Sequence, residues 1–144
     1  MVTLPQVHLS NDTITASLPN LVAVFVGATS GIGEAALKEF VRKPTQPKCY
    51  LVGRSEQFAN RIIEECKSFK KMSVWLAGAD RLCEKIKSME DTINILFLSA
   101  GAAIFDRSNT SEGLHALSAL AFYTRLRITQ LLLPLLECST APLG

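Results

Sequence analysis

The stretch LVAVFVGATSGIG, residues 21–33, decides the fold. Its first six residues are continuously apolar, which is typical of a strand buried on both faces of a sheet. Glycines follow at Gly27, Gly31 and Gly33, and from Ile32 onward apolar residues recur every three or four positions, as on one face of a helix. A buried strand is therefore expected to turn through a glycine-rich loop directly into an amphipathic helix.

The same alternation continues along the chain. Further buried strands are predicted at residues 49–52, 73–77 and 93–98, with helical patterns between them. Ser55 is expected to be the N-cap of the helix that follows the strand at residues 49–52. Strands that alternate with helices pair in parallel through right-handed crossovers, so the fold class is α/β, a doubly wound parallel sheet of Rossmann type.

Two helical patterns next to these strands predict which side chains face the core. The apolar positions of the first helix are Ile32, Ala36 and Phe40, with Leu37 and Val41 beside them. Those of the second are Phe58, Ile62, Cys66 and Phe69. A last, long helix is expected over residues 110–136, with Asn109 and Glu112 as a capping box and with Pro134 kinking or ending it. It is apolar on more than one face, so one face can cover the sheet and the other needs a partner.

Composition bounds the class of protein. A chain of 144 residues holds one domain, and 48% hydrophobic with 19% charged residues excludes a disordered tail. We divide it into a leading arm, residues 1–20, and the domain proper, residues 21–144. No apolar run approaches the ~18 residues of a membrane span, and a net charge of +2 argues against a nucleic-acid partner.

The cysteines and the N-terminal residues indicate a compartment. Cys49, Cys66, Cys83 and Cys138 lack the paired spacing of metal ligands, so no metal site is expected. The first residues have neither the basic start nor the apolar core of a signal peptide. We therefore expect a cytoplasmic protein with reduced, buried thiols rather than disulfides.

The glycine loop is suited to bind phosphate. Gly27 permits a tight turn, Gly31 allows the backbone to approach a pyrophosphate, and Gly33 allows the helix to pack closely on the strand. The N-terminus of the helix adds free N–H groups and a partial positive charge. A Walker loop is excluded because no lysine follows Gly33. The alternative is a glycine-rich turn that binds no ligand.

The spacing G-x-x-x-G-x-G resembles the cofactor loop of the short-chain dehydrogenase/reductase family. Residues 97–101, FLSAG, are similar to the Asn-Asn-Ala-Gly segment of that family, with Leu98 and Ser99 in place of the asparagines. The Ser-Ala-Gly, TSEGL and LLPLL segments are most similar to fungal short-chain reductases of secondary-metabolite biosynthesis. The resemblance covers residues 21–136 and implies a strand order 3-2-1-4, a nicotinamide cofactor, and a small carbonyl or alcohol substrate.

Arg54 favours NADP(H) over NAD(H). Dinucleotide folds that bind NAD carry a carboxylate at the end of the second strand, where this chain has Gly53, Arg54 and Ser55. A guanidinium there can bind the 2′-phosphate, although a solvated charge after a strand is the alternative. The resemblance also implies that Thr29 and Ser30 contact the phosphates. The predicted cofactor-binding residues are Gly27, Thr29, Ser30, Gly31, Ile32, Gly33, Arg54, Ala100 and Gly101.

No catalytic residue is predicted. The family's proton transfer needs a Tyr-x-x-x-Lys pair after a fifth strand, and the sequence ends at Gly144, where that strand is expected to begin. Tyr123 and Arg127 have the spacing Tyr-x-x-x-Arg but lie one element too early. The sequence therefore indicates a short-chain reductase truncated before its catalytic pair. The alternative is a non-catalytic, cofactor-binding remnant or an interaction module.

Three other positions depart from the family pattern. The asparagine expected on the long helix is Ala121 here. Asp80 is interpreted as the N-cap of its helix in preference to the family's adenine-binding aspartate. The strand at residues 93–98 lies at the edge of a four-stranded sheet, so we expect self-association through it or through the long helix at residues 110–136.

Overall fold

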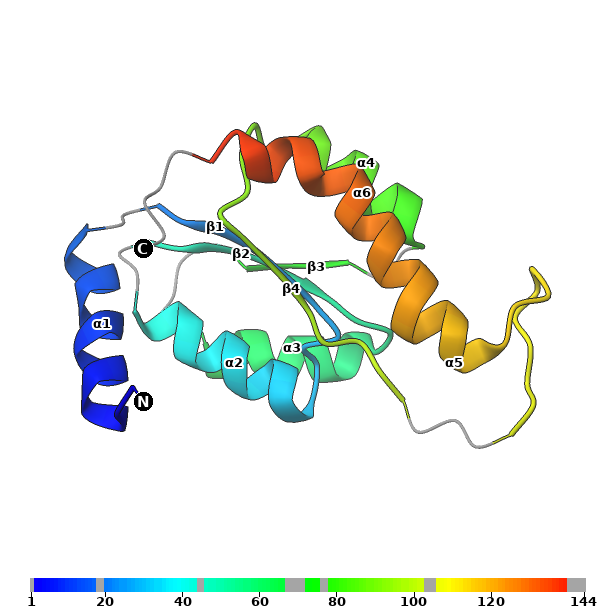
Figure 1. Ribbon diagram of the computed structural model, residues 1–144, viewed down its shortest axis with the longest axis horizontal. Helices are drawn as coiled ribbons and strands as arrows, with labels where there is room; N and C mark the ends of the chain where they lie inside the picture. The colour runs from blue at the N-terminus through cyan, green and yellow to red at the C-terminus, as the bar shows by residue number, and fades with distance from the viewer. Residues whose placement is uncertain are drawn as a thin grey trace.

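A parallel sheet of four strands is the centre of the computed structural model, in the order β3-β2-β1-β4 (Figure 1). The strands are β1 (Val22–Val26), β2 (Lys48–Val52), β3 (Met72–Trp75) and β4 (Ile95–Leu98). All three neighbouring pairs are parallel, and the observed order is the predicted one. The structure describes residues 2–17, 20–43, 46–66, 72–75, 78–102 and 106–139.

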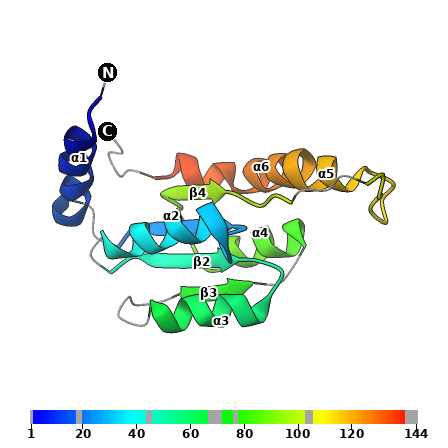
Figure 2. The same cartoon turned by 90° about the horizontal axis from the view of Figure 1, so that it is seen from below.

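Helices cover both faces of the sheet (Figures 1 and 2). One face carries α2 (Gly31–Arg42) and α3 (Glu56–Glu65). The other carries α4 (Ala79–Lys87) and one long helix made of α5 (Ala116–Ser118), the π-helical turn η1 (Ala119–Tyr123) and α6 (Thr124–Glu137). The first residues form α1 (Leu4–Ser17), whose described side chains are exposed.

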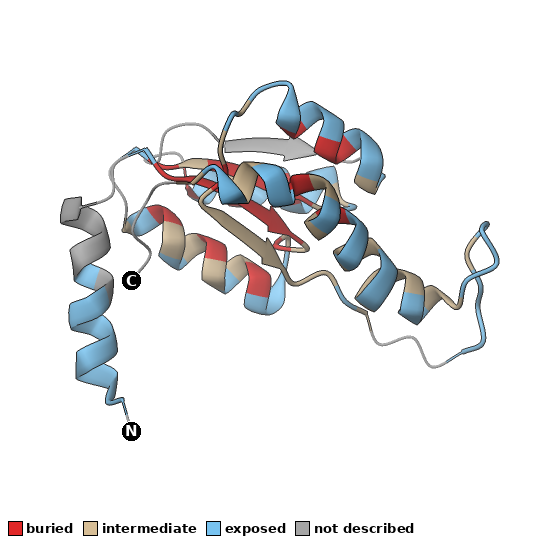
Figure 3. Cartoon of the chain, turned by 45° about the horizontal axis from the view of Figure 1, so that its top comes forward, coloured by how far each residue is buried: buried red, intermediate tan, exposed pale blue. Residues whose placement is uncertain are grey.

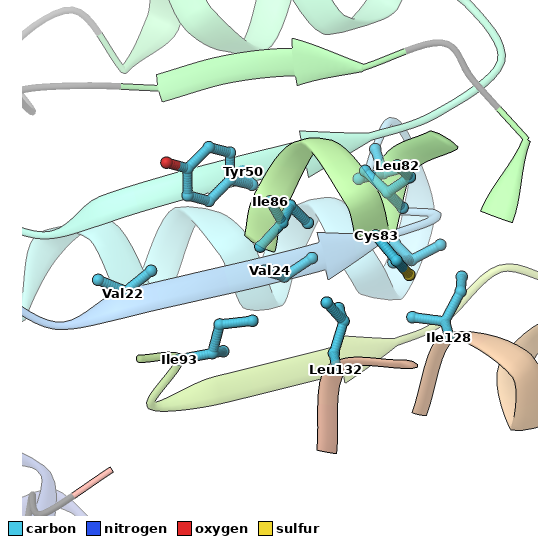
Figure 4. Packing of buried hydrophobic residues seen from close by; sticks show 11 residues of the cluster. Val22, Val24, Tyr50, Leu82, Cys83, Ile86, Ile93, Ile128 and Leu132 are labelled. Carbon is cyan, nitrogen blue, oxygen red and sulfur yellow. The ribbon is translucent and has the colours of Figure 1, made fainter. Parts of the chain in front are cut away.

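The core consists of two apolar layers separated by the sheet. Alternate side chains of a strand point to opposite faces, so Val22, Val24 and Val26 of β1 pack toward α4 and α6, while Ala23 and Phe25 pack toward α2 and α3. Figure 4 shows the first layer, in which Val24 lies among side chains of α4 and α6. Every residue of β1 is buried, as the continuous apolar run predicted (Figure 3).

The strand β4 lies at the edge of the sheet, as expected. Its neighbour on one side is β1, with Phe25 aligned with Phe97, and no described strand pairs with its other side. Its four side chains are half-buried, whereas those of β1 are buried (Figure 3). No helix in the described part of the chain is long and apolar enough to span a membrane.

The long helix begins later than predicted. Asn109 and Glu112 do not form a capping box; they lie in a turn in which Gly113 has a φ of 79°, a left-handed conformation that a right-handed helix cannot continue. The helix starts at Ala116, and the His115 side chain caps it by accepting a hydrogen bond from Leu117 N (3.3 Å). Pro134 does not end the helix, which continues to Glu137.

Two side chains that were expected in the core are exposed. Ile32 is 83% exposed, because the buried face of α2 consists of Gly33, Leu37 and Val41. Phe58 is 51% exposed, because the buried residues of α3 are Ala59 and Ile62. Both lie in the first turn of their helix, directly after the loop that leaves a strand. Phe69 lies outside the described residues.

The remaining expectations on caps and cysteines are mostly met. Ser55 is the N-cap of α3 and its Oγ accepts a hydrogen bond from Phe58 N (3.4 Å). The four cysteines are free thiols, of which Cys138 is exposed and the other three are buried. Burial raises the pKa of Cys49 to about 12 and that of Cys83 to about 11.

Candidate functional site

A cavity of about 450 Å³ opens at the carboxyl ends of β1, β2 and β4. In a doubly wound sheet this is where the chain leaves β1 toward β2 on one side while β4 lies on the other, and ligands bind in the crevice at such a switch point. Four segments far apart in the sequence line the cavity, and the α5–η1–α6 helix closes it. The lining residues are Val26, Gly27, Thr29, Ser30, Val52, Gly53, Arg54, Ser55, Phe58, Gly78, Ala79, Leu82, Ala100, Gly101, Leu120, Thr124 and Ile128.

Gly27 joins the glycine loop to the loop that follows β4. Its φ of 83° is open to glycine and strained for other residues, and its N–H donates a hydrogen bond to Val52 O (2.8 Å). A Cβ at this position would overlap the backbone of Ala100 and lie 2.9 Å from its Cβ. The missing side chain therefore allows the ends of β1, β2 and β4 to meet at the floor of the cavity.

Gly33 allows α2 to pack on the glycine loop and on the end of β4. A Cβ there would lie 2.8 Å from Gly27 O and 2.9 Å from Ala28 Cα, and would overlap Ser99 Oγ. Ser99 is itself fixed, because its N–H and its hydroxyl both donate to Val26 O, at 2.9 and 3.2 Å. The close packing of α2 on the strand that was expected at Gly33 is therefore present. Ser99, the residue in place of an asparagine in the resembled segment, is part of this contact.

The N-terminus of α2 presents unused donors beside the cavity. Ser30 is the N-cap, and its side chain makes no capping hydrogen bond. Gly31 has a φ of 61° and no atom within 4 Å of the position a Cβ would take. The first N–H groups of a helix have no partner within the helix and carry a partial positive charge, so this end attracts an anion. Gly31, Ile32 and Gly33 adjoin the cavity wall without being among its lining residues.

A carboxylate in the same turn is neutralised. Glu34 accepts a hydrogen bond from Lys38 and another from Arg61 (2.7 Å), and the hydrogen bond from Lys38 is the main reason that its pKa lies below the usual value. Glu34 therefore stays ionised but is held by two cations of α2 and α3. Its charge opposes an anion at the helix N-terminus less than a free carboxylate would.

Arg54 is the one charged side chain among the residues that line the cavity. It is exposed at the end of β2 and, within the described residues, has no carboxylate at ion-pair distance. Gly53 before it lies against Thr29, so the two loops are in contact and place Arg54 beside the glycine loop. The geometry leaves a guanidinium free at the mouth of the cavity.

Phe58 is a cavity residue that the sequence pattern did not predict. It lies one turn after Ser55 with half of its surface exposed, and the Arg61 guanidinium is 6.0 Å from its ring centroid. Its spacing with Ile62 and Cys66 made it resemble a core residue. Only its position in the first turn of α3, directly after the strand end, distinguishes it. Leu120 and Thr124, from the π-helical turn and the start of α6, were also not predicted.

The family's adenine-binding aspartate is not reproduced by Asp80. The N-cap of α4 is Gly78, so the interpretation of Asp80 as the N-cap is wrong; Asp80 lies in the first helical turn instead. Its carboxylate accepts a hydrogen bond from Arg127 Nε (2.7 Å), which ties α4 to α6 on the surface. Asp80 is not among the residues that line the cavity.

Neither tyrosine faces the cavity. Tyr123 is exposed, is not among the residues that line the cavity, and packs its ring edge-on against Phe122, with 5.2 Å between centroids. Tyr50 is buried in β2 and donates its hydroxyl proton to Glu90, which also binds Lys48 Nζ (2.7 Å). Burial, and then the bond to Glu90, raises the pKa of Tyr50. The described part of the chain thus brings no tyrosine–lysine pair to the cavity.

Comparisons with known proteins find relatives that match most of the chain. No family model matches the chain. It is 38% identical to the oxidoreductase andH of Emericella variicolor over 96% of its own length and 44% of that protein. It is 28% identical to the short-chain dehydrogenase/reductase SAT2 of Stachybotrys chartarum over 86% of its length and 43% of that protein. The chain therefore spans less than half the length of the curated relatives it matches.

Solved structures show the same fold. The RhlG/NADP complex of Pseudomonas aeruginosa superposes with a TM-score of 0.71 at 20% identity, over 90% of this chain and 53% of that one. At this identity the likeness concerns the fold alone, and it agrees with the strand order and helix layers described above. The sequence relatives agree with the resemblance carried by the glycine loop: the chain is similar to fungal oxidoreductases, one of which is named a short-chain dehydrogenase/reductase.

Proposed function

We propose that the cavity binds a nicotinamide dinucleotide, NADP(H) in preference to NAD(H), and that the chain is the cofactor-binding part of a short-chain reductase. The observation that carries this proposal is the free guanidinium of Arg54 beside a glycine loop at the N-terminus of α2. The floor supports it too, because a side chain at Gly27 would fill the space next to Ala100. The donor set fits a ligand with several phosphates.

Each part of the dinucleotide has residues that fit it. Thr29, Ser30, Gly31, Ile32 and Gly33 would hold the pyrophosphate with backbone N–H groups and hydroxyls at the start of α2. Arg54 would bind the 2′-phosphate. The half-exposed ring of Phe58, which lines the cavity as Arg54 does, would cover the adenosine end. Ala100 and Gly101 would approach the ribose next to the nicotinamide.

The reaction of the whole protein would be hydride transfer between this cofactor and a small carbonyl or alcohol. The cofactor supplies the hydride, and the described residues bind and orient it. No tyrosine in the described part of the chain lines the cavity, since Tyr50 is bonded to Glu90 and Tyr123 is not among the lining residues. A substrate from a secondary-metabolite pathway rests on the sequence resemblance described above, and the relatives are likewise fungal oxidoreductases. The unpaired cysteines support a reducing compartment, the cytoplasm.

A titration of the chain with NADPH and with NADH tests the cofactor assignment. Arg54→Ala should weaken NADPH binding by about 10- to 100-fold, the range expected for a lost hydrogen bond to a charged group, and leave NADH binding unchanged. Arg107→Ala, which removes an exposed arginine from outside the cavity lining, is the control and should bind NADPH as the unaltered chain does. Equal affinity for both dinucleotides, or an Arg54 variant with normal NADPH affinity, would overturn the assignment.

A non-catalytic role is the second candidate. Exposed apolar side chains run along the α5–η1–α6 helix, and β4 has a free edge. The exposed set comprises Leu117, Phe122, Tyr123, Leu126 and Leu133. These observations favour self-association of a cofactor-binding module. Oxidation of NADPH by the purified chain with a panel of ketones separates the two: turnover supports the enzyme, and binding without turnover supports the module.

A further inference from the structure

Arg125 of α6 contacts the loop that follows β4 from behind the cavity wall. Its Nη2 donates a hydrogen bond to Ala100 O (2.8 Å), and the same nitrogen is 3.9 Å from the position of a Cβ on Gly101. Ala100 and Gly101 both line the cavity, whereas Arg125 does not. Arg125 therefore touches the site only through the backbone of this loop.

Within the described residues, the guanidinium of Arg125 has Ala100 O as its one hydrogen-bond partner. Its Nε is buried without a hydrogen-bond partner in the described part of the structure, and no described carboxylate forms an ion pair with it. A half-buried cation without a counter-ion is unfavourable for folding by itself. Leu126 and Arg127, the next two residues, instead point to solvent or to Asp80. The cost at Arg125 indicates a role other than stability.

The hydrogen bond to Ala100 O fixes the orientation of one peptide group. In a trans peptide the C=O and the following N–H point in opposite directions, so the Gly101 N–H points away from Arg125. Within the described residues this N–H has no hydrogen-bond partner. The two residues before Gly101 are already fixed in place: Ser99 donates two hydrogen bonds to Val26 O, and Ala100 lies against Gly27. Arg125 thus fixes the orientation of the Ala100–Gly101 peptide group, which Ser99 and Gly27 leave free to rotate.

The π-helical turn η1 lies next to Arg125 and contributes to the same part of the site. Leu120 and Thr124 line the cavity, and the N–H of Thr124 bonds to Ala119 O, five residues back. Single π turns insert one extra residue into a helix and shift the side chains that follow. Arg125 comes directly after this turn and reaches the end of β4.

We propose that Arg125 is a positioning residue that orients the Ala100–Gly101 peptide, so that the Gly101 N–H is presented as a hydrogen-bond donor to the bound dinucleotide. This inference rests on the proposed function for its ligand, and on the Arg125–Ala100 contact alone for its mechanism. It assigns Arg125 neither a contact with the cofactor nor a proton transfer.

Three variants separate orientation from packing. Arg125→Met keeps an apolar stem of similar length without a donor, Arg125→Lys keeps a donor and the charge, and Arg127→Met removes a neighbouring arginine that binds Asp80 instead. Arg125→Met should weaken NADP⁺ binding by about tenfold, Arg125→Lys should retain most of the affinity, and Arg127→Met should bind normally. A packing role would leave the Met and Lys variants alike, which would overturn the proposal.

Backbone ¹⁵N relaxation of the chain without dinucleotide makes this test independent of the proposed function. The order parameters of Gly101 and Ala102 should fall in Arg125→Met relative to Arg127→Met, while those of β1 stay unchanged. If the unaltered chain does not bind NADP⁺ but this loss of order is found, the proposed function fails and the orienting contact stands. Unchanged order parameters in Arg125→Met overturn the inference.

Discussion

Gly33 lies where the packing below the site leaves no room for a side chain. Gly33→Ala places a Cβ against the backbone of Gly27 and Ala28, at 2.8 and 2.9 Å, so the start of α2 must shift. We expect a loss of about 1–3 kcal/mol in the free energy of unfolding, together with weaker dinucleotide binding. A urea titration followed by circular dichroism measures the loss.

Gly78→Ala is the matched control for this substitution. Gly78 has an ordinary φ of −60° and no atom within 4 Å of the position a Cβ would take. Since alanine is a poorer N-cap than glycine, the free energy of unfolding should fall by up to about 1 kcal/mol, without the further cost of a clash. If Gly33→Ala were no less stable than Gly78→Ala, the close packing of α2 on the loop would be refuted.

The cysteines should differ in reactivity because the thiolate is the nucleophile. Burial raises the pKa of Cys49 to about 12 and that of Cys83 to about 11, so both remain protonated at pH 8, and the buried Cys66 has a raised pKa as well. Iodoacetamide at pH 8 should therefore modify Cys138 first, as peptide mass spectrometry would show. As the pH rises, Cys83 should become reactive before Cys49. Early labelling of Cys49 would contradict its burial.

Single residues were predicted well where one local rule decides and less well where two compete. The N-cap at Ser55 follows from its hydroxyl alone. Ile32 and Phe58 fit the apolar period of their helices, but the period does not show which positions of a first turn the sheet covers, and both side chains are exposed. Asp80 is an excellent capping residue, yet Gly78 caps α4 and the Asp80 carboxylate pairs with Arg127, which is 47 residues away in sequence.

At the scale of elements, α6 should be stabilised by its buried face only. Leu132→Ala removes a fully buried side chain from the layer that contains Val24 and Ile128, and should cost about 2–5 kcal/mol in the free energy of unfolding (Figure 4). Leu133→Ala, in which the adjacent leucine is 45% exposed, should change it by less than about 0.5 kcal/mol. Thermal unfolding compares the two, and similar losses would mean that the face of α6 is misassigned.

Strands were predicted more accurately than the long helix. A buried parallel strand is a short apolar run, and β1, β2 and β4 lie within one or two residues of the expected positions. The capping box at Asn109 and Glu112 matched its pattern, but the left-handed Gly113 directs the chain into a turn. The π turn at η1 has no pattern in the sequence, because it depends on how the helix packs over the cavity.

At the scale of the whole molecule, exposed apolar surface is the main liability. Phe122, Leu126 and Leu133 on the long helix and the free edge of β4 favour contacts with a second copy. Sedimentation velocity over a concentration series should show self-association of the isolated chain, and Phe122→Asp should reduce it. A monodisperse monomer at all concentrations would contradict this expectation.

The strand order shows which part of the fold the sequence pattern predicts and which part it does not. The alternation of strands and helices predicts a parallel sheet, but the order 3-2-1-4 came from the resemblance carried by the glycine loop, and the sheet has that order. The cavity was predictable in the same way, since Gly27, Thr29, Ser30, Arg54, Ala100 and Gly101 all line it. The roles of Phe58, Leu120 and Arg125 at this site could not be predicted from the sequence, because they depend on how α3 and the long helix pack over the strand ends.

An amide-resolved NMR titration of the chain with NADP⁺ tests the central claim most directly. The account predicts saturable binding, with the largest shifts at Gly27 to Gly33, at Arg54 and at Ala100 and Gly101, and small shifts at the amino ends of the strands. Saturation with shifts confined to other surfaces, or a folded chain with no shifts at all, would contradict it.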